Sequence, residues 1–269
     1  MQKASRWLLT ETKGASGRAA VVVTMNSNKV NAINPEMLAD FEAALTTLER
    51  DTRLPVVLTG EPGNATMCAG LDLAYLFGCD KAESRTRTEH VLSRLGVCVE
   101  RMYTLPRPTV AALSGHALAG GAVIANSCDF RVGVRGSRAG FGVIEVQVGV
   151  PFPSWPFITS YLATPPNHRG DAILYGKRYT HDEAFVAALL HELAAEPSAL
   201  VQRAVDKATQ LPEGSATAFA LVKEQMVEDA LRYCKERSVA RMEKVMQCLY
   251  SDAGWAQIQN TLNAVQRKK

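Results

Sequence analysis

The sequence predicts an α/β fold with parallel strand pairing, followed by a region built from helices. In the first half of the chain, short apolar runs rich in β-branched residues alternate with segments of helical periodicity. Such runs are typical of buried strands, and strands that alternate with helices favour a parallel sheet. From Asp182 onward the pattern is almost wholly helical, with breaks near Pro197 and Pro212.

Residues 19–25 form the first strand-like run, Ala-Ala-Val-Val-Val-Thr-Met. A helix is predicted to follow, because Asn34 suits the N-cap, Pro35 suits the first helical position and Glu36 lies in the first turn. This helix has an apolar stripe at helical spacing, formed by Met37, Leu38, Phe41, Leu45 and Leu48.

Three more strands are predicted at residues 56–59, 109–113 and 130–134. A long helix is expected over residues 81–103, and a glycine turn with a short helix after residue 113. One face of the long helix is apolar, with Val91, Leu92, Leu95, Val99 and Met102. After Gly149 we expect a loop-rich stretch, because it is punctuated by Pro151, Pro153, Pro156, Pro165 and Pro166.

Composition narrows the class of protein. The chain has 269 residues, enough for one large domain or two small ones, and its 47% apolar content supports a substantial core. The formal charge of +3 is carried by dispersed residues, which does not mark a nucleic-acid binder. The six cysteines lack C-x-x-C spacing and no secretory segment is visible, so we expect reduced thiols in an intracellular protein.

The chain has no apolar run long enough to span a membrane. Its first nine residues are basic, and two interpretations stay open for them. They are the remnant of a transit peptide or a short tail that enters the first strand.

Glu145 is the single carboxylate in residues 140–149, a segment that is otherwise apolar, glycine or amide. Its neighbours Val143, Ile144 and Val146 exclude water, and loss of hydration favours the protonated form of a carboxyl group. Such a group either lowers stability without having a function or transfers protons in a reaction. The sequence therefore makes Glu145 a candidate acid and base.

Two upstream segments resemble ligand-binding turns, residues 67–73 and 114–122. Each follows a predicted strand, is rich in small residues and leads into a helical pattern. Glycine lets the backbone approach a ligand closely, and a helix start offers unpaired N–H groups. A single turn of this kind is more often only a tight connection between a strand and a helix. Two turns followed by a lone glutamate favour a pair of N–H donors that stabilise an oxyanion beside an acid/base group.

The ordered set of motifs resembles the enoyl-CoA hydratase/isomerase (crotonase) superfamily from about Arg6 to the C-terminus. No single motif is decisive, but their order is highly specific. The matching segments are residues 28–34 (Asn-Lys-Val-Asn-Ala-Ile-Asn), 68–73 (Cys-Ala-Gly-Leu-Asp-Leu), 106–115, 119–121, 128–131, 141–149 and 176–184.

The resemblance can be narrowed within the superfamily. Its hydratases carry two glutamates, because water addition requires both activation of water and delivery of a proton to carbon. The first would stand three positions after Gly120, where this chain has Val123. With Glu145 alone and Gln147 two residues later, the pattern resembles the mitochondrial Δ3,Δ2-enoyl-CoA isomerases, in which one glutamate moves a proton from C2 to C4.

The resemblance implies a role for each matching residue. Glu145 would be the catalytic base, while the backbone N–H groups of Leu71 and Gly120 would hold the thioester oxygen. Asp72 is also expected to fix the loop after the first turn. The residues expected to bind CoA or the acyl group are Lys29, Val30, Ala32, Ala69, Gly70, Asp72, Leu73 and Ile144.

The resemblance also implies an architecture and a set of partners. We expect a crotonase-like ββα spiral core over residues 1–200 and a C-terminal helical trimerisation region over residues 201–269. The expected substrate is an acyl-CoA thioester, with CoA as part of the substrate and no metal or redox cofactor. The expected assembly is a homotrimer in the mitochondrial matrix, with a peroxisomal, glycosomal or cytoplasmic location left open.

Alternatives remain at this point. Another acyl-CoA reaction on the same scaffold, such as hydration or thioester hydrolysis, is the enzymatic alternative. A binding protein is the other, since some crotonase relatives bind RNA. The predicted helix at 36–50 carries Glu36, Asp40, Glu42 and Glu49 against Arg50 alone, and such an acidic face would repel phosphate. His191-Glu192 begins like a zinc-protease helix but lacks the second histidine, so no metal is expected there.

Overall fold

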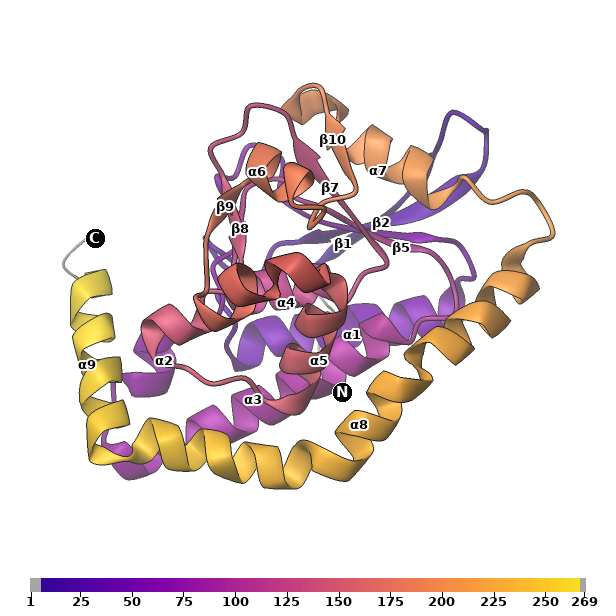
Figure 1. Cartoon of the computed structure of the whole chain (residues 1–269). Helices are drawn as coiled ribbons and strands as arrows, with labels where there is room; N and C mark the ends of the chain where they lie inside the picture. Colours follow the sequence, from indigo (N-terminus) through magenta and orange to yellow (C-terminus); the bar gives the residue numbers. More distant parts are fainter. Residues whose placement is uncertain (1–5, 267–269) are drawn as a thin grey trace.

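The computed structural model describes residues 6–266 and confirms the predicted α/β class (Figure 1). Most of the basic N-terminal segment, residues 1–5, lies outside the described residues, so the transit-peptide hypothesis is not addressed there. The first strand, β1, begins at Leu8. Within residues 6–266 no helix is both long and apolar enough to cross a membrane.

In residues 6–266 the main sheet has six strands in the spatial order β1-β2-β3-β5-β7-β10. β1 is antiparallel to β2, and every later neighbour is parallel, as the sequence predicts. The strands are β1 (Leu8–Lys13), β2 (Ala19–Met25), β3 (Val56–Gly60), β5 (Thr109–Ala112), β7 (Phe130–Val134) and β10 (Glu192–Ala194).

A second sheet with the order β4-β6-β8-β9 lies beside the first in the described chain. Its strands are β4 (Thr66–Cys68), β6 (His116–Leu118), β8 (Gly140–Gly142) and β9 (Tyr179–Thr180). Three of them directly follow β3, β5 and β7 along the chain, and a helix comes next each time. This is the ββα spiral implied by the family resemblance. The sequence did not reveal these strands, because two or three residues are too few to show a period.

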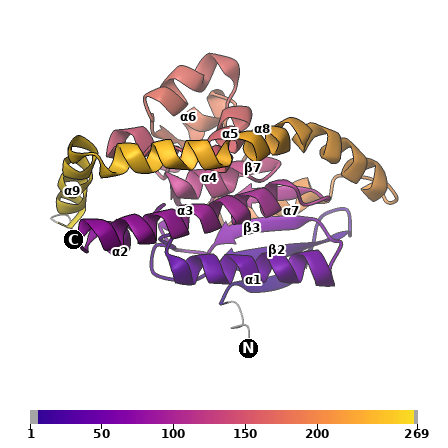
Figure 2. The ribbon, with the colours of Figure 1, turned by 90° about the horizontal axis from the view of Figure 1, so that it is seen from below.

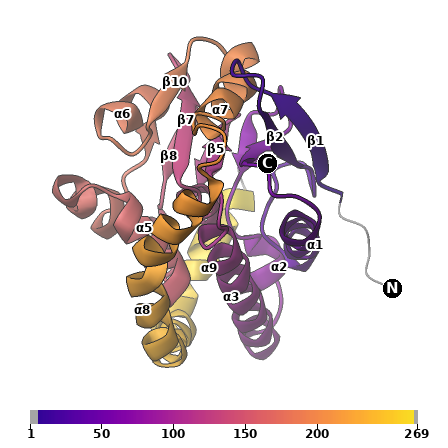
Figure 3. The ribbon, with the colours of Figure 1, turned by 90° about the vertical axis from the view of Figure 1, so that its right-hand side faces the viewer.

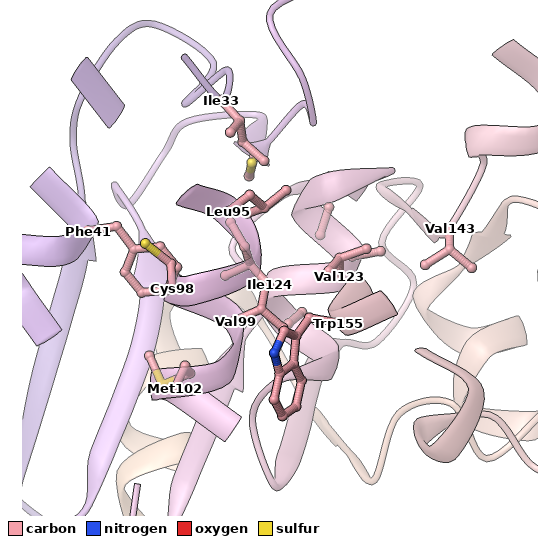
Figure 4. Close-up of a cluster of buried hydrophobic side chains, with 14 of the residues drawn as sticks. Ile33, Phe41, Leu95, Cys98, Val99, Met102, Val123, Ile124, Val143 and Trp155 are labelled. Atoms are coloured by element: carbon pink, nitrogen blue, oxygen red, sulfur yellow. The ribbon is translucent and has the colours of Figure 1, made fainter. Parts of the chain in front are cut away.

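Helices cover both faces of the main sheet. α1 (Pro35–Asp51), α3 (Lys81–Tyr103), α4 (Gly120–Asn126) and α5 (Ser154–Ala163) lie on one side, and α7 (Leu200–Ala208) lies on the other (Figures 1 and 2). Side chains of β2 alternate between the two faces. Val21 and Val23 join the core beneath α1 and α3, whereas Ala20 and Val22 join the smaller core beneath α7. Figure 4 shows part of the larger core.

The predicted helix boundaries of the first half are confirmed. α1 begins after Asn34, whose side chain accepts a hydrogen bond from the Met37 N–H at 3.0 Å. α3 spans the predicted residues 81–103.

Two expectations for the second half are wrong. The stretch after Gly149 contains α5, in which Pro156 is tolerated because first-turn N–H groups have no partner inside a helix. The region after Asp182 is not wholly helical, since β10 joins the edge of the main sheet after the short α6 (His181–Val186). His191 therefore precedes a strand rather than a zinc-protease helix.

Two helices end the chain, α8 (Ala216–Tyr250) and α9 (Asp252–Gln266). α8 runs past α3 and α5 (Figure 3). α9 then turns back beside α2 (Leu73–Phe77), where the Gln259 side-chain amide donates to the Phe77 carbonyl oxygen at 3.1 Å. A C-terminal helical region is thus present, while its separation as a unit over residues 201–269 stays a prediction.

Candidate active site

The first predicted turn is held against the segment that follows β2. The Ala69 N–H donates to the Val30 carbonyl at 3.0 Å, and the Ile33 N–H donates to the Gly70 carbonyl at 2.7 Å. Gly70 has a φ of +88°, a conformation that side chains disfavour, and so it turns the chain toward Leu71. The structure therefore brings together residues 29–33 and 69–72, which sequence analysis assigned to one site.

The second turn is strained at Ala119, a residue that sequence analysis did not single out. Ala119 has φ 50° and ψ −125°, a backbone conformation that is costly for a residue with a β-carbon. Its N–H donates to the Gly142 carbonyl of β8 at 2.9 Å, which fixes the turn to the neighbouring strand. α4 begins at the next residue, Gly120. The strained peptide thus sets the direction of the Gly120 N–H.

The two turns touch. A β-carbon placed on Gly70 would lie 3.2 Å from the Gly120 nitrogen and 2.9 Å from the Ala119 β-carbon. Among the hydrogen bonds of residues 6–266, neither the Leu71 N–H nor the Gly120 N–H has an acceptor. Two unpaired backbone donors on adjoining turns are suited to stabilise an oxyanion.

Glu145 follows β8, the strand that pairs with β6 just before the second turn. Leu118 of β6 faces Gly142 of β8, and Glu145 begins a short 3₁₀ helix three residues later. The side chain is buried, with only 6% of the residue exposed, and its Oε2 atom has no hydrogen-bond partner. Burial raises the pKa of Glu145 to about 8, while a hydrogen bond from its own backbone N–H opposes the rise. A carboxyl group with such a pKa can exchange a proton near neutral pH.

Asp72 has a structural role in the free protein, as expected. Its side chain caps α2 by accepting the Tyr75 N–H at 3.1 Å, and it also accepts the Asn34 amide at 3.2 Å. Leu73 is the first residue of α2. Both residues fix the chain after the first turn.

The other predicted binding residues surround these turns. Lys29 and Ala69 are exposed, whereas Val30, Ala32 and Ile144 are partly buried. The Lys29 carbonyl accepts the Asn64 side-chain amide at 2.9 Å, and no ion pair within residues 6–266 contains the Lys29 side chain.

Sequence analysis missed Asn31, which organises the first turn. It is buried, has a φ of 46°, and donates to the Met25 and Met67 carbonyls at 3.2 and 3.0 Å. Its Oδ1 accepts the Ser27 N–H at 2.9 Å. Asparagine tolerates the left-handed conformation better than most residues, and that preference was the available signal.

Val123 lies one turn into α4 and is fully buried in the large core (Figure 4). In the three segments that build the site, residues 68–73, 116–126 and 140–149, the carboxylates are Asp72 and Glu145. Since Asp72 is committed to a helix cap, Glu145 is the better proton carrier.

The acidic face expected on α1 is largely neutralised. Glu42 binds Arg94 at 2.8 Å, and Glu49 binds Arg101 at 2.7 Å, both arginines coming from α3. Asp40 is buried and binds Arg6 at 3.0 Å. The prediction that this helix repels phosphate is therefore weakened, because arginines pair with most of its acidic side chains.

The comparisons with known proteins agree with this geometry. The family model for enoyl-CoA hydratase/isomerase matches residues 16–262. Mouse mitochondrial enoyl-CoA delta isomerase 1 is 31% identical over 196 residues, which cover 72% of this chain and 65% of the relative. The short-chain-enoyl-CoA hydratase of Clostridium acetobutylicum is 29% identical over 212 residues, or 77% of each chain.

A solved structure supports the fold. The human mitochondrial delta3-delta2-enoyl-CoA isomerase superposes with a TM-score of 0.83 at 23% identity, covering 98% of this chain and 100% of that one. At this identity the likeness establishes the fold alone. The relatives include both isomerases and hydratases, so they define the family rather than the reaction. Since the family model spans most of the sequence, this chain belongs to the enoyl-CoA hydratase/isomerase family and has its crotonase fold.

Proposed function

We propose that this protein is a Δ3,Δ2-enoyl-CoA isomerase, which converts cis- or trans-3-enoyl-CoA to 2-trans-enoyl-CoA in the β-oxidation of unsaturated fatty acids. One observation carries the proposal. Glu145 is a buried carboxyl group with a pKa near 8, whereas the position three residues after Gly120 holds Val123, which cannot transfer a proton.

In the first step, ionised Glu145 removes a proton from C2 of the substrate. The electrons of the C2–H bond form a C1–C2 double bond, and negative charge moves onto the thioester oxygen. The N–H groups of Leu71 and Gly120 donate to that oxygen. Each donor at such a site contributes about 10²–10³ in rate.

In the second step, the protonated Glu145 returns the proton to C4. The electron pair of the C3–C4 double bond forms the new C–H bond, the C1–C2 electrons move to C2–C3, and the thioester carbonyl is restored. The carboxyl group takes up one proton and gives back one proton, so a single carboxyl group suffices. CoA enters as part of the substrate, and these steps use no other cofactor.

Hydration of 2-enoyl-CoA is the second candidate, because a relative of 29% identity is named a hydratase. This reaction needs one group to activate water and another to protonate carbon. Asp72 is the other carboxylate in the site segments, and its oxygens accept the Tyr75 N–H and the Asn34 amide. The arrangement therefore favours isomerisation.

The deciding experiment compares two rates in one enzyme preparation by ultraviolet absorbance. 3-Enoyl-CoA should be isomerised much faster than 2-trans-enoyl-CoA is hydrated, and Glu145→Gln should lower the isomerase kcat by at least about 10². Glu89→Gln is the matched control, because Glu89 is an exposed carboxylate on α3 outside the site segments. Comparable rates for the two substrates, or an active Glu145→Gln enzyme, would contradict the proposal.

A further inference from the structure

A cavity of about 560 Å³ lies at the end of the main sheet opposite the candidate active site. It is lined near the starts of three parallel strands, by Ala19 at β2, Pro55 before β3 and Pro108 before β5. The proposed catalytic turns lie beyond the other ends of β3 and β5, after the short strands β4 and β6. In Figure 1 the link between α7 and α8, which forms part of this cavity, lies far from α2 and α9.

Three arginines line the cavity, and their hydrogen bonds go to backbone carbonyls. Arg18 donates to the Thr209 carbonyl at 2.7 and 3.0 Å, and Arg53 donates to the Glu49 carbonyl at 3.0 Å. Arg107 donates through Nη1 to the Leu48 carbonyl at 3.0 Å and to the Thr52 carbonyl. Among the ion pairs within residues 6–266, none contains any of these three arginines.

Arg107 is the informative member, because only 4% of it is exposed. Its Nε and Nη2 atoms form no hydrogen bond within the described chain, and they are not fully enclosed by protein atoms. Burial lowers the pKa of Arg107, and the nearby positive charge of Arg53 lowers it further. The negative charge of Glu49 raises it. Glu49 itself binds Arg101 at 2.7 Å. A buried cation without a carboxylate partner is costly, and an anion that pairs with it would offset the cost.

The start of α8 adds a second positive influence. This helix has 35 residues, and its N-cap side chain, that of Ser215, makes no capping hydrogen bond. Ala216, Thr217 and Ala220 of its first turns line the cavity. The unpaired N–H groups and the dipole of a helix start favour a negative charge nearby. Glu213 is the acidic residue in the lining and offsets only part of this charge.

Apart from Thr209 and Gly214, the remaining lining is apolar and would leave a bare inorganic anion with little to contact. It consists of Leu54, Pro55, Pro106, Pro108, Ala208, Leu211 and Pro212, with the alanines of α8. The volume is within the range of small-molecule pockets. We propose that this cavity is a second ligand site, which binds an amphipathic carboxylate with its head on Arg53 and Arg107 and its chain against Leu54 and Leu211.

Calorimetric titration with decanoate tests the proposal, with decanol and acetate as probes that lack the charge or the chain. Decanoate should bind with one-to-one stoichiometry, and each of the other probes should bind at least about tenfold more weakly. Arg53→Gln should weaken decanoate binding about tenfold or more, as expected for loss of a charged hydrogen bond. Ala216→Glu should do the same by placing a negative charge in the cavity.

Arg50→Gln is the matched control, because Arg50 lies three residues from Arg53, is exposed, and pairs with Asp51 outside the cavity lining. It should leave decanoate affinity unchanged. Thermal melts check that every variant is folded; an acidic residue in the first turn of α8 should not harm the helix.

Methyl NMR locates the ligand. Decanoate should shift the methyl signals of Leu54 and Leu211, but not those of Ile33 and Leu71 beside the catalytic turns. The proposal is wrong if decanoate gives no saturable binding, if Arg53→Gln and Ala216→Glu bind it normally, if acetate binds as tightly, or if the shifts appear at the catalytic turns. None of these outcomes depends on which reaction the active site catalyses.

Discussion

Glu145 is the residue whose environment links chemistry to pH most directly. Its pKa is raised to about 8 by burial, so the ionised base becomes more abundant as pH rises. We expect kcat/KM for 3-enoyl-CoA to increase about tenfold per pH unit below pH 8 and to level off above it. Initial rates in overlapping buffers from pH 5 to 9 measure this; a profile that is flat over that range would remove Glu145 as the titrating base.

The same burial predicts a cost in stability. The pKa of Glu145 is about 8 in the folded protein, against an ordinary value of 4.5, so between these pH values the folded state holds a proton that the unfolded state has lost. Stability from this group is therefore lost as pH rises from about 4.5 to 8, at no more than about 1.4 kcal/mol per pH unit. Glu145→Gln should unfold at a higher temperature than the parent at pH 8, and the difference should shrink toward pH 4.5. Equal melting curves at pH 8 would contradict the raised pKa.

Gly120 offers a test of close approach at the second turn. A β-carbon there would lie 2.6 Å from Ile33 Cδ1, the mobile end of a side chain. Gly120→Val should therefore abolish turnover, because its side chain displaces Ile33 and crowds the thioester oxygen, while the core stays folded. Activity, circular dichroism and thermal melts measure the effect.

Ile33→Val removes the methyl group that a side chain at position 120 would meet. The double variant Gly120→Ala with Ile33→Val should therefore be more stable than Gly120→Ala alone, yet it should regain little activity. Full activity in any folded Gly120 variant would make this only a packing glycine.

At the residue scale, the sequence made Glu145 a candidate through its apolar surroundings, and it made Leu71 and Gly120 candidates through the turns and motifs that resemble the family. It did not identify Ala119, since nothing about an alanine signals a positive φ. The Ala119 N–H pairs with the Gly142 carbonyl of another strand, and only the folded chain brings that partner to a strained residue.

At the scale of elements, a buried ion pair ties α8 to the main sheet. Lys223 Nζ lies 3.0 Å from the Asp129 carboxylate, which also accepts the Thr109 N–H at 2.8 Å. Lys223→Met should lower the free energy of unfolding by about 3 kcal/mol, because it leaves Asp129 partly buried without its cation. Urea titration measures the loss.

The double variant Lys223→Met with Asp129→Asn supplies the control for this pair. It should recover part of the stability, since neither charge is then left alone. If the single variant is as stable as the parent, the pair does not anchor α8. Lys235→Met, at an exposed position on the same helix, should change stability little.

Helices were predicted more accurately than short strands. The long periodic segments at α1 and α3 carry their own caps and apolar faces, so local sequence suffices for them. β4, β6 and β10 have three residues each, and their pairing depends on distant partners: Thr66 of β4 pairs with His116 of β6, and Glu192 of β10 pairs with Val132 of β7. The same limit explains why β10 was taken for helix, whereas α5 was taken for loop because prolines punctuate that stretch.

At the scale of the whole molecule, the candidate active site and the arginine-lined cavity lie at opposite ends of the main sheet. The turns after β4 and β6, together with the segment after β8, gather the proposed catalytic groups, and each comes from a successive ββα turn of the spiral. The opposite end of the main sheet holds the arginine-lined cavity. The sequence predicted the first of these regions through its motifs. It gave no signal for the second, whose arginines are spread over residues 18, 53 and 107.

The spatial order of the main sheet has a consequence for biosynthesis. From β1 to β10 each strand pairs with the strand that preceded it in that sheet, so the sheet extends in one direction as the chain is made. A nascent chain can therefore add each strand to a neighbour that has already left the ribosome, without waiting for a distant segment. The growing edge stays open to wrong partners until β10 is synthesised. Ribosomes that pause between residues 134 and 192 would expose β7, which makes this interval the period of greatest risk of aggregation and of greatest need for a chaperone.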